Sequence, residues 1–275
     1  MTEISPLESV LKRDRAVVLA GLIGVTALAW VYLFAMAAGM GEMSQGGVTG
    51  GGAMAALQVR PWGGLDFLLM FLMWAVMMVA MMVPGAAPMI LLFAAVNRKQ
   101  RERGRPFAPV GAFVAGYIAV WSAFSAVATL SQWGLEQAAL LSPMLVGTSP
   151  LLGGGLLIVA GIYQWTPLKH ACLKHCRSPL HFLTHGMRKG TGGAFVMGLE
   201  HGAFCVGCCW VLMGLLFVGG VMNLLWVAAI AAFVLLEKVV PHGVLAGRLG
   251  GLLAGRLSGA LLVLAGLFAA FQGWG

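Results

Sequence analysis

Two short stretches of the chain gather side chains that bind soft metal ions. The first is the run His170-Ala-Cys172-Leu-Lys-His175-Cys176. On a helix, Cys172 and Cys176 would lie one turn apart on the same face. Thiolates and imidazoles arranged in this way suit a soft or borderline ion such as Cu(I) or Zn(II). The alternative is an ordinary basic loop in which the His and Cys residues are incidental.

The second stretch places three cysteines inside one apolar segment. Four of its side chains recur at every fourth position, so a helix would align them on one ridge: His201, Cys205, Cys209 and Met213. Cys208 lies beside this ridge, and Glu200 precedes it. Ionisable residues within an apolar span are costly and indicate a functional site by default. The alternative is that the cysteines only pack between helices and that Glu200 and His201 lie at the membrane interface.

Methionines form a third group, in the segment before these two. Four of them recur at intervals of three and four residues and would share one helical face: Met70, Met73, Met77 and Met81. A thioether is a soft, neutral ligand that binds Cu(I) without bringing charge into a membrane. Methionine also serves as adaptable core packing. Ligation is favoured here because the same chain carries the cysteine ridge. Pro84 and Pro88, in the same segment, are expected to break or kink the helix and to free backbone carbonyls.

The composition indicates where these groups must lie. The 275 residues are 60% hydrophobic and only 9% charged, with a mean hydropathy of +0.92, whereas soluble domains carry roughly 25% charged residues. This excludes a soluble enzyme, a disordered protein and a nucleic-acid-binding domain. Seven apolar segments of membrane-spanning character follow one another: 16–38, 65–96, 108–130, 150–167, 194–218, 221–240 and 257–272. We therefore predict a single membrane domain over residues 1–275, all-α and polytopic, with seven transmembrane helices.

The basic residues predict the orientation of these helices. If the seven segments all cross, 16 of the 17 Lys and Arg residues fall on one side of the membrane, and only Arg60 falls on the other. The positive-inside rule then places the N-terminus in the cytoplasm and the C-terminus outside. Residues 242–256 could instead form an interfacial or re-entrant helix. Glu237 and Lys238, near the inner end of the sixth segment, are expected to pair or to extend towards the interface.

Motifs for other chemistry are absent from the sequence. It contains no phosphate-binding P-loop, no His-Glu-x-x-His protease motif and no Gly-x-Ser-x-Gly nucleophile elbow. We therefore expect neither ATP-driven pumping nor enzymatic activity of these kinds.

Three blocks of the sequence carry a family resemblance. They are Trp74-Ala-Val-Met77-Met78-Val-Ala-Met81-Met82-Val-Pro84; Gly161-Ile-Tyr163-Gln164-Trp165-Thr166-Pro167-Leu168-Lys169 with Cys172 and Cys176; and Gly202-Ala-Phe-Cys205-Val-Gly207-Cys208-Cys209-Trp210, followed by Met222-Asn223 and Glu237-Lys238. Over residues 62–240 the chain resembles a bacterial family of metal-binding integral membrane proteins. One member helps to deliver copper to a bacterial tyrosinase (polyphenol oxidase). The resemblance implies copper handling, with the five cysteines and the methionine face as ligands.

We predict an inner-membrane protein that binds Cu(I) and delivers or translocates it to a partner, either a copper-dependent enzyme or a soluble copper carrier. Copper would pass by ligand exchange from the group of His170, Cys172, His175 and Cys176 to the ridge of His201, Cys205, Cys208, Cys209 and Met213. It would then pass along Met73, Met77 and Met81 to the outer Gly/Met-rich loop, residues 39–64. Zn(II), or no metal, is the alternative cargo. Two other functions stay open: a thiol–disulfide redox carrier, because Cys205 and Cys208 have Cys-x-x-Cys spacing, and a scaffold subunit of a membrane complex.

Overall fold

The computed structural model describes residues 6–46, 62–102, 108–141, 149–178, 188, 190–239 and 247–272. Within these ranges the chain forms α-helices and no β-strand, so the all-α prediction is confirmed. The helices are α1 (Pro6–Gly46), α2 (Gly64–Glu102), α3 (Val110–Gln137), α4 (Pro150–Tyr163), α5 (Pro167–Arg177), α7 (Gly190–Gly214), α8 (Leu216–Gly219), α9 (Leu224–Val239) and α10 (Gly247–Gln272).

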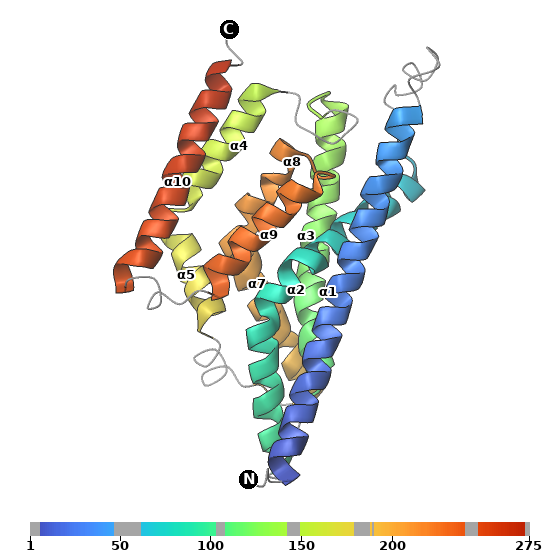
Figure 1. Ribbon diagram of the computed structural model, residues 1–275, viewed down its shortest axis with the longest axis vertical. Coiled ribbons are helices and arrows are strands. Elements are labelled where there is room, and N and C mark those ends of the chain that lie inside the picture. The colour runs from blue at the N-terminus through green and yellow to red at the C-terminus, as the bar shows by residue number, and fades with distance from the viewer. Residues whose placement is uncertain are drawn as a thin grey trace.

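The long helices alternate in direction along the long axis of the molecule. Helices α1, α3, α7 and α10 run one way, and α2, α4 and α9 run the other way (Figure 1). Five described helices are long and apolar enough to cross a membrane, and α4 with α5, which meet at a 65° bend, would make a sixth span. Helix α9 has only 16 residues. The count of seven crossings therefore stays a prediction.

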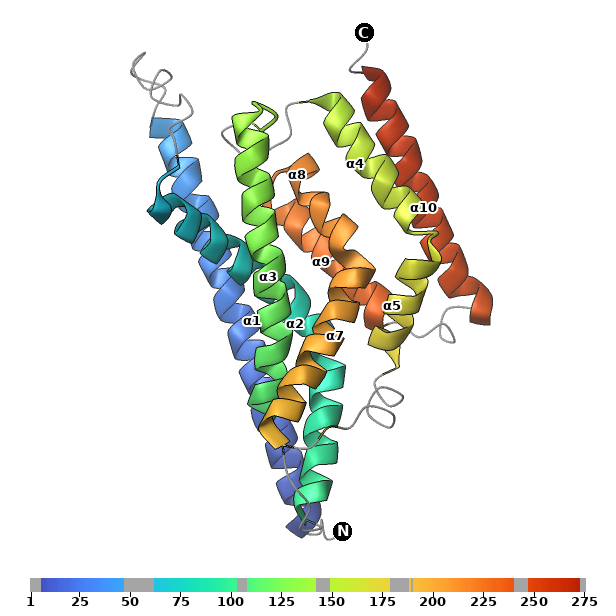
Figure 2. The ribbon, with the colours of Figure 1, turned by 180° about the vertical axis from the view of Figure 1, so that it is seen from behind.

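The proline pair in α2 does not end the helix. Helix α2 continues through Pro84 and Pro88 from Gly64 to Glu102, and Figure 2 shows it bent partway along its length. The predicted break of the helix is therefore wrong, whereas the predicted kink agrees with this bend. Each proline removes one backbone donor, and a helix can tolerate this loss by bending. The hydroxyl of Tyr117, on α3, donates a hydrogen bond to the carbonyl of Met82, close to the prolines (3.0 Å).

The segment after α9 also differs from one of the expectations. Residues 247–256 begin the long helix α10, which continues to Gln272, so they do not form a separate re-entrant helix. Residues 242–246 lie outside the described ranges. Because α10 is continuous, it packs along α4 over much of its length.

Glycines set the close crossing of α3 and α7. A methyl group on Gly198 would lie 2.0 Å from the carbonyl oxygen of Phe113, and one on Gly116 would lie 2.1 Å from that of Phe195. Only glycine permits backbones to approach so closely. This crossing holds the cysteine-bearing helix α7 against Tyr117 of α3, and α2 and α9 pack around the same interior.

Candidate metal-binding site

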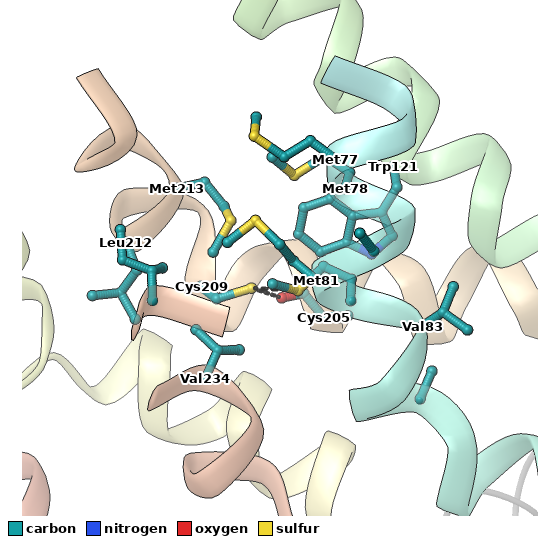
Figure 3. Close-up of a cluster of buried hydrophobic side chains, with 14 of the residues drawn as sticks. Met77, Met78, Met81, Val83, Trp121, Cys205, Cys209, Leu212, Met213 and Val234 are labelled. Atoms are coloured by element: carbon teal, nitrogen blue, oxygen red, sulfur yellow. Dashed lines mark hydrogen bonds between the residues drawn. The ribbon is translucent and has the colours of Figure 1, made fainter. Parts of the chain in front are cut away.

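The three cysteines of α7 lie in the protein interior. Cys205, Cys208 and Cys209 are all buried, as the predicted helical ridge requires. The thiols of Cys208 and Cys209 donate hydrogen bonds to the carbonyl oxygen of Cys205, at 3.1 and 2.9 Å. Figure 3 shows the contact between Cys209 and Cys205 at the centre of a group of sulfur-bearing side chains.

Helix α5 brings two further cysteines to α7. The helix begins with Thr166 as its N-cap and Pro167 at its first position. Because α5 packs on α7, the thiol of Cys176 lies near those of Cys205 and Cys208. Cys172 packs on Gly207, where an added methyl group would lie 2.8 Å from its sulfur. The two cysteine groups predicted from the sequence are therefore neighbours; we call Cys176, Cys205, Cys208 and Cys209 the thiol cluster. All five cysteines are free.

A buried lysine also contacts the thiol cluster, and no local pattern in the sequence predicted this contact. The Lys238 nitrogen lies 3.0 Å from the sulfur of Cys205 and 3.6 Å from that of Met82. The Tyr117 hydroxyl lies 3.1 Å from the same Cys205 sulfur. The expected Glu237–Lys238 pairing is wrong, because Glu237 binds Lys169 instead. Adjacent helical residues point about 100° apart, so the two side chains reach different helices.

The methionine face of α2 is buried beside the thiol cluster. Met73, Met77 and Met81 are almost fully inaccessible. Figure 3 shows Met77 and Met81 turned, with Met213, towards the interior that holds Cys205 and Cys209. The methionine in contact with a thiol is Met82, whose sulfur lies 3.9 Å from that of Cys209. Met82 belongs to the same run of methionines in the sequence. The intervals of three and four residues, however, favoured the neighbouring helical face, which carries Met73, Met77 and Met81.

A comparison with known protein families identifies the family of this chain. A family model described as PpoB2, copper chaperone, matches residues 71–268, which is most of the chain. The chain belongs to this copper chaperone family. The match confirms the predicted family and extends the common region beyond residue 240, into α10. No curated protein and no solved structure matches the chain.

The structure places the three predicted histidines differently around the thiol cluster. His170 is exposed. His175 stacks on Phe204 with ring centroids 4.1 Å apart, and its Nδ1 bonds to the Ala171 carbonyl. His201 is buried between the rings of Phe113 and Tyr117. The Cys205 sulfur contacts the Lys238 nitrogen and the Tyr117 hydroxyl instead.

The thiols point along their own helix in this conformation. Among the described residues, no three His, Cys, Asp or Glu side chains are arranged to hold a metal ion. The reason is visible at Cys208 and Cys209, whose thiols bond to a backbone carbonyl instead of facing a common point. Copper binding by these cysteines would require rotation of their side chains, and the Met82 thioether is a further sulfur donor beside them.

Proposed function

We propose that this copper chaperone is an integral membrane protein that binds Cu(I) at the thiol cluster and delivers it to a partner protein. The observation that carries the proposal is the packing of α5 on α7, which brings Cys176 near Cys205 and Cys208. Cys176 lies 29 or more positions from these two residues in the sequence, yet the fold places it beside the apolar interior that holds them. Soft thiolate and thioether ligands favour Cu(I).

The surface of the molecule supports a membrane location. Large apolar side chains face outwards on several helices, including Leu28 on α1, Leu225 on α9 and Phe271 on α10. Water would disfavour so much exposed apolar surface, whereas lipid tails would not. The distribution of basic residues then favours an N-terminus in the cytoplasm, and the family resemblance suggests a bacterial inner membrane.

We infer that copper moves through the protein by ligand exchange. Cys172 and Cys176 are only partly buried, so they can receive Cu(I) first and pass it to Cys205 and Cys209. The methionine face would then carry the ion towards the start of α2 and the partner, a copper-dependent enzyme or a soluble carrier. Thiolates hold Cu(I) more tightly than thioethers, so this order of ligands allows release. The role needs no catalysed reaction.

The test is the copper content of protein purified without oxygen. We expect about one copper ion per chain in the wild type, and loss of that copper in a Cys205→Ser/Cys208→Ser/Cys209→Ser variant. Ala203→Ser is the matched control, because it adds a hydroxyl to an exposed face of the same helix without removing a thiol.

Two other results would each favour a different function. Absence of copper from the wild type, with a Cys205–Cys208 disulfide that forms and is reduced reversibly, would favour the thiol-redox carrier. The scaffold role would be favoured by either of two results. One is absence of copper without such a disulfide, and the other is the same copper content in the triple variant as in the wild type. Either result would mean that the thiol cluster is not a copper site.

A further inference from the structure

Lys238 places its amino group beside the sulfur atoms of the site. Its side chain is only 7% exposed. Its nitrogen lies 3.0 Å from the Cys205 sulfur and 3.6 Å from the Met82 sulfur. An ammonium group is seldom buried in an apolar interior without a specific partner. Here the partners are the same sulfur atoms that the proposed function assigns to copper.

The fold leaves space for this ammonium group. Gly85, on α2, faces the Lys238 side chain, and a methyl group there would lie 3.1 Å from Cδ and 3.5 Å from Nζ. A methyl group at position 85 would require the lysine side chain to shift by a few tenths of an ångström. The position of the charge therefore follows from the crossing of α2 and α9.

The neighbouring charges do not cancel that of Lys238. Glu237 is the next residue, but both of its carboxylate oxygens bind Lys169, so that pair is neutral. Arg177 donates to the backbone carbonyl of Glu237 and is partly exposed, so solvent screens its charge. Lys238 is thus the buried cation that acts on Cys205.

We propose that Lys238 is a specificity-determining residue that makes the site favour a monovalent metal ion over a divalent one. The inference rests on the proposed function, with Cys205 and Cys209 as thiolates and Met82 as a neutral third donor. Each thiol that binds the ion gives up its proton. Two thiolates, one Cu(I) ion and the Lys238 ammonium then have no net charge. Zn(II) held by the same two thiolates would leave one unbalanced positive charge in the interior, which is strongly unfavourable. The charges would balance only if a third thiol of the cluster also lost its proton.

The effect on selectivity does not depend on how Lys238 affects the thiols themselves. Stabilisation of the thiolates by the ammonium applies equally to both metal ions, so it cancels in the ratio of their affinities. Coulomb repulsion between the ammonium and the metal ion doubles when the charge of the ion doubles. Removal of the ammonium must therefore favour the divalent ion more than the monovalent ion.

The experiment compares Cu(I) and Zn(II) binding to the full-length protein in detergent without oxygen. Competition with chelators of known affinity gives the two dissociation constants, and Co(II) serves as a coloured probe of divalent binding to thiolates. In Lys238→Met we expect the ratio of Zn(II) to Cu(I) affinity to rise at least about tenfold. We also expect a thiolate-to-Co(II) absorption band that the wild type lacks. Lys238→Arg keeps the charge and should keep the wild-type ratio, even if both affinities fall.

The failure of this inference is distinguishable from failure of the proposed function. A wild type that binds no Cu(I) would contradict the proposed function. A wild type that binds Cu(I) but binds Zn(II) equally tightly would overturn the role of Lys238 alone, and so would an unchanged ratio in folded Lys238→Met. Lys238→Gln provides a second neutral variant if the Met variant does not fold.

Discussion

Lys169 on α5 and Glu237 on α9 form a buried ion pair, in which the ammonium nitrogen lies 2.9 and 2.8 Å from the two carboxylate oxygens. The same ammonium donates to Gln164, and Arg177 donates to the Glu237 carbonyl. Helix α9 therefore holds α5 through Glu237, while the next residue, Lys238, reaches Cys205 on α7. Two consecutive residues of α9 thus contact the two helices that carry the thiol cluster.

Loss of one partner of this ion pair should loosen α5. We expect Lys169→Met to lower the free energy of unfolding by about 3–5 kcal/mol, because it leaves the Glu237 carboxylate buried without its cation. The double variant Lys169→Met/Glu237→Met should lose less than the single variant, since neither charge remains. Denaturant titration of the protein in detergent measures both values. A double variant as unstable as the sum of the two single variants would contradict a direct pair interaction.

The exposed ion pair between Arg188 and Glu200 provides the matched control. Its side chains are 53% and 36% exposed, so solvent screens the attraction. Glu200→Gln should change the free energy of unfolding by less than about 1 kcal/mol. A loss as large as that of Lys169→Met would show that burial is not what distinguishes the two pairs.

The α3–α7 crossing should not tolerate a methyl group. In Gly198→Ala the new carbon would meet the Phe113 carbonyl at 2.0 Å, so the two helices must separate. We expect a loss of about 1–3 kcal/mol or more in the free energy of unfolding and faster alkylation of Cys205. Gly111→Ala, also at a helical glycine but with no neighbouring atom within 4 Å, should be neutral or stabilising by up to about 1 kcal/mol.

The sequence predicted the helical fold and both cysteine groups because these depend on local patterns. Apolar segments define helices, and intervals of four residues put Cys205 and Cys209 on one ridge. Ligand exchange requires Cys176 to lie near that ridge, but no local pattern could predict this proximity. It depends on the 65° bend between α4 and α5 and on the Lys169–Glu237 pair. The contact between Lys238 and Cys205 was missed for a similar reason, because the two residues lie 33 positions apart in the sequence.

The hydroxyl of Tyr117 should stabilise the fold without serving copper. Tyr117→Phe removes the hydrogen bond to the Met82 carbonyl and the contact with the Cys205 sulfur. We expect a loss of about 0.5–1.5 kcal/mol in the free energy of unfolding, with the copper content unchanged. Tyr32→Phe, at an exposed position on α1, should change neither quantity. Loss of copper in folded Tyr117→Phe would instead assign the phenol a part in binding.

The thioether of Met82 should contribute to copper affinity through its sulfur and not through its volume. Met82→Leu preserves an apolar side chain of similar size, so the free energy of unfolding should change by less than about 1.5 kcal/mol. Met82 is the thioether in contact with Cys209, and we expect the dissociation constant for Cu(I) to rise about tenfold, which corresponds to about 1.4 kcal/mol. Met89→Leu is the control, since Met89 is equally buried on the same helix but lies two turns further on. Equal effects of the two substitutions on copper binding would mean that the methionines act only as packing, because only one of them has a thiol beside its sulfur.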